Sequence, residues 1–174
     1  MEYVSRFETP FGPGFVVAGG VGIRRVLLPF DGLEQSMAGY VSGSSGASTT
    51  SERVAEMLTN HFRGCVQQFE NIEVELLVGG EFRQKVLHLI RGIPAGQVRS
   101  YGEVATLAGA PRASRAVGGA MAANPVPVIV PCHRVISGDR RLTGYTAPGG
   151  LDLKKWLLKL EGVEFIGERV CQVK

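Results

Sequence analysis

Cysteine is scarce in this sequence, and the few cysteines are not spaced for disulfides or for a metal centre. The 174 residues contain three cysteines and no Cys-x-x-Cys pair. An odd number without such pairs argues against a disulfide framework and indicates free thiols in a reducing compartment. His61 lies four residues before Cys65, but two ligands do not make a zinc site. We therefore predict no disulfide and no metal ion, and expect Cys65 and Cys171 to be inert.

Long apolar runs and a leader peptide are also missing. No hydrophobic stretch approaches the roughly 18 to 20 residues that a transmembrane helix needs, and the first residues, MEYVSRFETPFG, lack the features of a signal peptide. The chain is 44% hydrophobic and 20% charged, which suits a folded core rather than disorder. A net charge of +3 permits a polyanionic partner without indicating one. We expect a soluble, cytoplasmic protein.

The N-terminal part predicts a small antiparallel sheet with one helix. Runs rich in β-branched and aromatic residues are divided by the turn sequences PFGPG and GGVG. The Ser/Gly/Thr stretch from Ser42 to Ser51 predicts a mobile surface loop. The expected elements are strands at 3–9, 15–20 and 22–30, a helix at 52–64 and a further strand at 69–77.

After Gly79-Gly80 the pattern becomes helical, and we place a domain boundary there. Ser100 and Glu103 have the spacing of a capping box at the start of a short helix, and a second short helix follows a glycine-containing turn. Two short helices joined in this way form a helix-turn-helix. The predicted fold class is therefore α+β, with a small N-terminal sheet and a mostly helical C-terminal domain. The expected helices cover 82–93, 100–111, 112–124 and 151–163, followed by a loose tail.

The second short helix, RASRAVGGAMAAN, is unusually rich in alanine and glycine. Such a small face suits either close packing against the protein's own core or insertion into the narrow minor groove of DNA. Arg112 and Arg115 are three residues apart, which would make them neighbours on a helix surface and bring both within reach of phosphate. A regulator that reads the major groove is disfavoured, because its recognition helix carries long polar side chains.

Cys132 lies in VPVIVPCHRVI, which predicts a buried strand leading into a turn. A thiol reacts as its thiolate, and an ordinary pKa of about 8.5 leaves little of that form at neutral pH. His133 is a candidate base, and Glu161 is a candidate carboxylate to orient the imidazole. Adjacent side chains of an extended chain point to opposite faces, so a direct contact between Cys132 and His133 is not assured. The alternative is an inert core thiol beside a capping histidine.

Five segments in one order and at one spacing together resemble the O6-alkylguanine-DNA alkyltransferases. They are IPAGQVRSYGEVA, RAVGGAM, NPVPVIVPCHRVI, LTGY and LLKLEG, and the match spans residues 82–162. The resemblance implies a ribonuclease H-like α/β domain over 1–79 and a helix-turn-helix, alkyl-acceptor domain over 80–174. It also implies DNA repair by direct reversal. An alkyl group on O6-alkylguanine, or on O4-alkylthymine, in double-stranded DNA would be transferred irreversibly to Cys132.

The same resemblance implies a role for each site residue. The helix-turn-helix would bind the minor groove and flip the damaged nucleotide out of the stack. Arg115 would fill the vacated space, and Tyr101 would turn the nucleotide. His133, oriented by Glu161, would take the thiol proton through a water, while Asn124 would link the recognition helix to the active-site turn. The implied DNA contacts also include Arg112, Ser114, Ala116 and Gly118, and the base pocket would be formed by the Val135 carbonyl, Tyr145 and Thr146.

The resemblance further implies a single turnover without a cofactor, because the product is a thioether. We expect a monomer that acts in the cytoplasm, or at the nucleoid if the source is a prokaryote. The loop Tyr145–Gly150 is two residues longer than the family pattern, so that pattern does not determine the width of the pocket. Arg140 and Arg141, in SGDRRL, would add phosphate contacts or form a solvated charged turn.

Three other functions compete with alkyl transfer. A lesion sensor on the same scaffold would lack the acceptor thiol, whereas Cys132 is present. A regulator that is switched by alkylation of Cys132 would normally carry further domains. A cysteine hydrolase is disfavoured because its cysteine and histidine are usually far apart in sequence.

Overall fold

The computed structural model describes residues 1–76 and 79–172, and its contacts divide the chain into two units, Met1–Glu75 and Leu76–Lys174. The domains expected from sequence, 1–79 and 80–174, stay predictions, with a boundary four residues beyond this division. None of the helices in the described part of the chain is long and apolar enough to span a bilayer.

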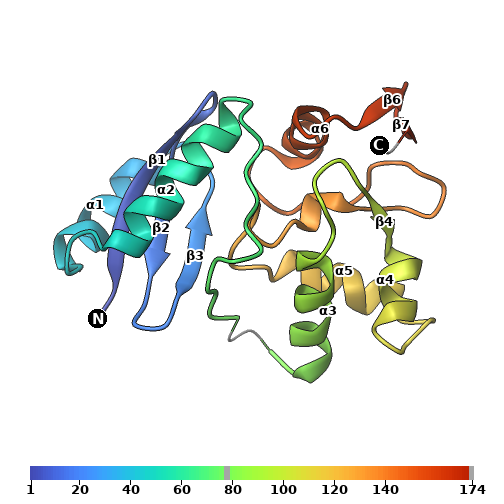
Figure 1. The fold of residues 1–174 in the computed structure, drawn as a ribbon, viewed down its shortest axis with the longest axis horizontal. Coiled ribbons are helices and arrows are strands. Elements are labelled where there is room, and N and C mark those ends of the chain that lie inside the picture. The colour runs from blue at the N-terminus through green and yellow to red at the C-terminus, as the bar shows by residue number, and fades with distance from the viewer. Residues whose placement is uncertain (77–78, 173–174) are drawn as a thin grey trace. The chain divides into compact units, whose positions relative to one another are not determined.

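The first unit is a three-stranded antiparallel sheet with two helices, which confirms the predicted N-terminal sheet (Figure 1). The register pairs Arg6 with Phe15 and Phe15 with Leu27. Phe7 from the first strand stacks on Phe62 from the second helix, with ring centroids 6.1 Å apart. The elements are β1 (Tyr3–Thr9), β2 (Gly12–Ala18), β3 (Ile23–Leu27), α1 (Leu33–Gly43) and α2 (Thr49–Phe62).

Two predictions in this unit are wrong. The stretch predicted as a mobile loop, Ser42–Ser51, contains the end of α1 and the start of α2, because Ser48 and Ser51 form a reciprocal capping box (3.1 and 2.9 Å). Helix α1 was not predicted, and its Leu33 and Met37 pack on the sheet. The predicted strand 69–77 reduces, within the described residues, to a single parallel bridge from Val74 to Ile23. Leu77 lies outside the described residues.

The second unit is mostly helical, as predicted (Figure 1). Its strands form two small pairs: β4 runs parallel to β5, and β6 runs antiparallel to β7. The elements are α3 (Glu81–Arg91), β4 (Arg99–Ser100), α4 (Tyr101–Leu107), α5 (Ser114–Ala122), the 3₁₀ turn η1 (Cys132–Arg134), β5 (Val135–Ile136), α6 (Gly150–Leu160), β6 (Glu164–Ile166) and β7 (Arg169–Gln172).

The predicted helix-turn-helix is present as α4 and α5, which pack on each other. Its capping box is also confirmed: Ser100 N donates to Glu103 Oε2 (2.7 Å), and Glu103 N donates to Ser100 Oγ (3.1 Å). Gly109, with a φ of 82°, occupies the left-handed conformation that the turn between the helices requires. The turn thus uses the one residue type that adopts this backbone without strain.

Two predictions in this unit are also wrong. The apolar run before Cys132 forms turns and one bridge between Pro127 and Val130 rather than a strand, because its prolines lack the amide donors of a ladder. The tail predicted as loose forms the β6–β7 hairpin, with Gly167 at a φ of 60° in its turn. The alternation on either side of that glycine is a hairpin signal that the sequence analysis overlooked.

Candidate active site

Cys132 is the first residue of η1, and this residue is 6% exposed and lines a small pocket. In an extended chain the side chains of Cys132 and His133 would point to opposite faces. In this 3₁₀ turn successive residues point only about 120° apart. The pocket has a volume of about 90 Å³ and joins α4, α5, η1 and the loop before α6. It is lined by Tyr101, Gly118, Met121, Ala122, Cys132, Gly144, Tyr145 and Thr146.

The segment that delivers Cys132 to the pocket is strained and held by Asn124. The Nδ2 atom of Asn124 donates to Val130 O (2.8 Å), and its Oδ1 accepts from Val126 N (3.1 Å). Between these contacts Val128 has a φ of 73°, a rare conformation for a β-branched residue that costs about 1–3 kcal/mol. Such strain persists only where the surroundings impose it, so Asn124 is a positioning residue for Cys132.

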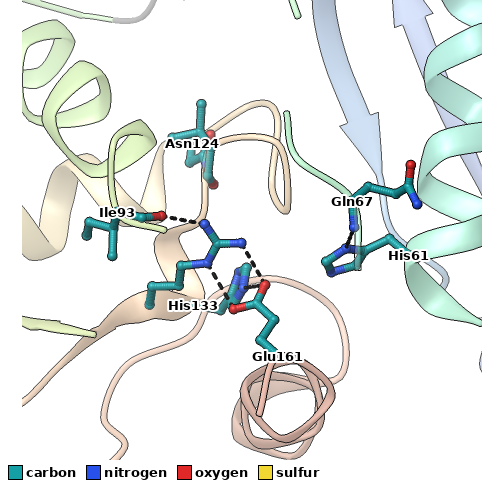
Figure 2. Close-up of polar contacts among 8 residues, drawn as sticks. His61, Gln67, Ile93, Asn124, His133 and Glu161 are labelled. Carbon is teal, nitrogen blue, oxygen red and sulfur yellow. Dashed lines mark hydrogen bonds and ion pairs between the residues drawn. The ribbon is translucent and has the colours of Figure 1, made fainter. Parts of the chain in front are cut away.

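Directly after Cys132 in the chain, His133 is connected through Glu161 with Arg134, an arginine that was not predicted to belong to the site. Figure 2 shows the carboxylate beside the imidazole, with His133 Nε2 at 2.9 Å from Glu161 Oε1. Arg134 makes a two-point contact with the same carboxylate, from Nε to Oε2 (2.9 Å) and from Nη2 to Oε1 (2.7 Å). A third Arg134 nitrogen, Nη1, donates to the carbonyl oxygen of Ile93. All three side chains of the cluster are buried.

Electrostatics keep Glu161 charged and His133 neutral. Burial raises the pKa of the Glu161 carboxyl, but His133 and Arg134 outweigh burial and the net pKa is lowered. Burial lowers the pKa of His133, although Glu161 opposes this shift. Because Arg134 already compensates the carboxylate, we assign a neutral imidazole that donates from Nε2 to Glu161. Its Nδ1 is then a free acceptor, and it has no hydrogen-bond partner among the described residues.

The thiol of Cys132 is neutral in the free protein. Burial raises its pKa, and the side chain of Asn124 and the charge of Lys154 only partly offset this effect. A buried neutral thiol needs a base before it can act as a nucleophile. The unpaired Nδ1 of the neighbouring His133 is the acceptor that the site offers.

Lys154, on α6, is the second site residue that the sequence analysis missed. Its fully buried ammonium donates to the carbonyl oxygens of Val135 (2.6 Å) and Thr143 (3.0 Å). It also lies 5.9 Å from the ring centre of Tyr101 and 6.0 Å from that of Tyr145. Burial lowers the pKa of Lys154 to about 8. The sequence signal was a lysine on the same helical face as the buried Leu157 and Leu158.

Two of the predicted pocket residues, Tyr145 and Thr146, line the cavity, and so does Tyr101, which was predicted to turn the nucleotide. The Tyr101 hydroxyl donates to the carbonyl oxygens of Thr143 (3.2 Å) and Gly144 (3.3 Å). Burial, followed by the nearby Cys132, raises the pKa of the Tyr145 hydroxyl well above its ordinary value. The side chain of Val135, by contrast, is fully buried, and its carbonyl oxygen already accepts from Lys154.

The residues predicted to contact DNA lie on or just before α5. Arg115 and Ala116 are exposed, and Ser114 and Gly118 are partly exposed. Arg112 precedes α5 in the turn, so the argument from helical spacing with Arg115 does not apply to it. No atom lies within 4 Å of the position that a Cβ would occupy at Gly118 or Gly119. The small face of α5 is therefore open there rather than filled by the protein's own core.

The remaining cysteines lie outside this pocket. Cys65 and Cys171 are exposed, and the Nδ1 atom of His61 accepts from Gln67 N (3.1 Å), as Figure 2 shows. Within residues 1–76 and 79–172, no three His, Cys, Asp or Glu side chains converge as metal ligands.

Comparison with known proteins places this site in a family. Residues 81–163 match the family model described as "6-O-methylguanine DNA methyltransferase, DNA binding domain". The methylated-DNA–protein-cysteine methyltransferase of Methanosarcina acetivorans is 36% identical over 170 residues, covering 92% of this chain and 98% of that protein. The protein of the same name from Mycobacterium bovis is 46% identical over 161 residues, covering 92% and 93%.

Solved structures agree with the sequence matches. A crystal structure of Mycobacterium tuberculosis OGT in complex with DNA has a TM-score of 0.75 and 35% sequence identity, and the match covers 92% of this chain and 93% of that one. A crystal structure of the Mycobacterium tuberculosis O6-methylguanine methyltransferase gives the same values. The chain therefore belongs to the methylated-DNA–protein-cysteine methyltransferase family.

Proposed function

We propose that this protein repairs alkylated DNA by direct reversal, transferring the alkyl group of O6-alkylguanine to the sulfur of Cys132. The observation that carries the proposal is the buried thiol in a pocket lined by both helices of the helix-turn-helix, next to a neutral histidine with an unpaired Nδ1. An inert core thiol would need neither the pocket nor the charged cluster of His133, Arg134 and Glu161.

The chemistry begins with removal of the thiol proton. A water would carry this proton from Cys132 to His133 Nδ1, and Glu161 would stabilise the imidazolium that forms. The sulfur then attacks the alkyl carbon, the bond from that carbon to guanine O6 breaks, and its electron pair stays with guanine, which is protonated. The product is an S-alkyl thioether, which ordinary reductants do not reverse. The protein would therefore act once, without a cofactor.

DNA binding would bring the lesion to the pocket. The open face at Gly118 and Gly119 supports entry of α5 into the minor groove, which admits only a slim element. Arg115 is exposed on the same helix and would occupy the space that the flipped nucleotide leaves. Tyr101 lies at the pocket and would turn the nucleotide inward. Unstacking is less unfavourable for a damaged, poorly paired base, which favours lesions.

Pocket residues would then hold the base. Tyr145 and Thr146 line the cavity and would cover the base. The Val135 carbonyl would accept from the guanine amino group with its second lone pair, since Lys154 uses only one. The protein would act as a monomer. O4-alkylthymine is a second candidate lesion.

Intact mass spectrometry tests the proposal directly. We expect the protein to gain the mass of one methylene after mixing with a duplex that contains one O6-methylguanine, with a limit of one equivalent. Cys132→Ser should show no gain, whereas Cys65→Ser and Cys171→Ser should behave as the original chain, because both of these thiols are exposed and outside the pocket. Tight lesion binding without any gain of mass would indicate a sensor on this scaffold, and repeated turnover would indicate a hydrolase.

A further inference from the structure

The turn after β5, residues 137–141, is firmly braced. Ser137 N donates to Arg141 O (3.1 Å), and Arg140 N donates to Ser137 O (3.0 Å). The C-terminal hairpin supports the turn, since Val170 N donates to Arg140 O (2.9 Å) and Arg141 forms an antiparallel bridge with Arg169. Backbone contacts therefore set the direction in which the Arg140 side chain leaves the turn.

Arg140 occupies a backbone conformation that disfavours arginine. Its φ is 67°, in the left-handed region where glycine or asparagine is the usual residue. The side chain is exposed and, within the described parts of the chain, takes part in no hydrogen bond or ion pair. Folding alone does not explain an arginine here, and residues kept in such strained positions are concentrated at functional sites.

Two further arginines lie beside it. Arg141 and Arg169 are exposed, and the Nε atom of Arg141 lies 3.5 Å from Oδ2 of Asp139, the carboxylate of the turn. Glu168 on the hairpin pairs with Lys155 at 3.4 Å. Among residues 1–76 and 79–172, no salt bridge joins Arg140 or Arg169 to a carboxylate. This arginine surface (Arg140, Arg141 and Arg169) carries three positive charges. The carboxylate of Asp139 interacts with two of them, Arg141 and Arg169, whereas Arg140 has no salt bridge within the described residues.

The arginine surface is attached to the pocket mouth at both ends of the turn. Before the turn, Ile136 pairs with Ser100, which caps α4 next to Tyr101. After the turn, two residues lead to Gly144, which lines the pocket and accepts from the Tyr101 hydroxyl (3.3 Å). The four residues from Arg140 to Gly144 span at most about 14 Å when extended, which is between one and two Debye lengths at 0.1 M ionic strength. A phosphate at the pocket mouth thus lies within the field of these arginines.

We propose that the arginine surface binds the DNA backbone beside the nucleotide that enters the pocket, with Arg140 as its main contact. Guanidinium groups suit this role because they donate two parallel hydrogen bonds to phosphate. The contact is independent of base sequence and adds to the one expected from α5. This inference rests on the proposed function, since it takes DNA to be the polyanion that reaches the pocket.

The salt dependence of binding to a short undamaged duplex tests the inference without any alkyl transfer. Arg140→Gly removes the charge and also relieves the positive φ, so the variant should fold at least as well as the original chain. Losing one phosphate contact makes the slope of log K against log salt less negative by about 0.9. The affinity lost by Arg140→Gly should accordingly be about 3.5-fold larger at 50 mM than at 200 mM salt.

Two controls separate a local contact from a general effect of charge. Arg140→Lys keeps the charge at the same backbone position and should retain most of the slope. Arg53→Ala removes an exposed arginine of α2 in the other unit and should leave the slope unchanged. An unchanged slope for folded Arg140→Gly would overturn the inference, as would an equal change in Arg53→Ala. Failure of the proposed function would look different, because it would appear as a missing mass gain on Cys132 in the original chain.

Discussion

The Nζ atom of Lys154 lies 2.6 Å from the carbonyl oxygen of Val135 and 3.0 Å from that of Thr143. These two carbonyls belong to the chain on either side of the 137–141 turn. One buried ammonium on α6 therefore ties together the segment that follows Cys132 and the segment that leads into the pocket loop. Its charge also lowers the pKa of the neighbouring thiol, against the larger opposite effect of burial.

Replacing this ammonium should weaken both the fold and the site. Lys154→Met keeps the length of the side chain but removes the ammonium that donates to the carbonyl oxygens of Val135 and Thr143. Losing these hydrogen bonds should lower the free energy of unfolding by about 1–3 kcal/mol. The pKa of the Cys132 thiol should rise further, and transfer at neutral pH should slow. Urea denaturation and single-turnover kinetics measure the two effects. Lys155→Met is the matched control, because its ammonium makes hydrogen bonds only at 3.4 Å and lies 5.6 Å from the ring centre of Phe165. Equal losses in both variants would contradict this assignment.

Glu161→Gln should be more harmful than its small change in shape suggests. The guanidinium of Arg134 would remain buried without its carboxylate, and breaking such a pair costs about 3–5 kcal/mol. His133 would also lose the group that orients it, so we expect transfer to slow by about 10²-fold or more in the protein that stays folded. Denaturation curves and single-turnover rates measure these losses. Glu164→Gln, at an exposed position of β6, should change neither quantity. A stable Glu161→Gln variant with normal transfer would show that the cluster is not part of the site.

Acid should destabilise the protein in two steps. The pKa of His133 is lowered from its ordinary value of 6.5, so the unfolded chain binds this proton more readily and stability falls as the pH drops below about 6.5. The pKa of Glu161 is lowered from 4.5, so a second loss begins below about 4.5. Chemical denaturation between pH 8 and pH 4 should show the first step, and His133→Gln should remove it. His88→Gln, at an exposed position, should retain it.

Gly118→Ala should change protein stability and DNA affinity in opposite directions. No atom lies within 4 Å of the added Cβ, so the free energy of unfolding should rise by about 0.5–1 kcal/mol through helix propensity. DNA affinity should nevertheless fall, because the methyl group protrudes from the face that we place in the groove. Gly39→Ala on α1 also meets open space and should stabilise the protein without weakening DNA binding. Unchanged DNA affinity for Gly118→Ala would argue against this face as the binding surface.

Local patterns allowed several elements to be predicted. The capping box at Ser100 and Glu103 marks the start of α4, because both partners lie within one helical turn. The three N-terminal strands follow from alternation and glycine-rich turns. Glu161 was a candidate partner of His133 on chemical grounds, and the resemblance to a known family supported it, because no local signal links two residues 28 positions apart.

Other features could not be predicted from the sequence, because they depend on contacts between distant parts of the chain. Helix α1 has an unremarkable sequence and exists because Leu33 and Met37 bury themselves against the sheet. Three prolines stop VPVIVPCHRVI and the residues just before it from forming the strand that its apolar side chains suggested. No role was predicted for Arg134, because its contacts with Glu161 join residues 27 positions apart.

The amino-acid sequence alone determined the fold class and the helix-turn-helix, and it led to Cys132 as the proposed acceptor. Each depends on periodicity, capping or a motif that is continuous along the chain. Tertiary structure decided the protonation states of the Cys132 thiol and of His133. It also decided that Arg134 neutralises the charge of Glu161 and that Lys154 binds the carbonyl oxygens of Val135 and Thr143. These properties arise from burial and from charges brought close by folding, and the free energy of a charge depends on its surroundings in three dimensions.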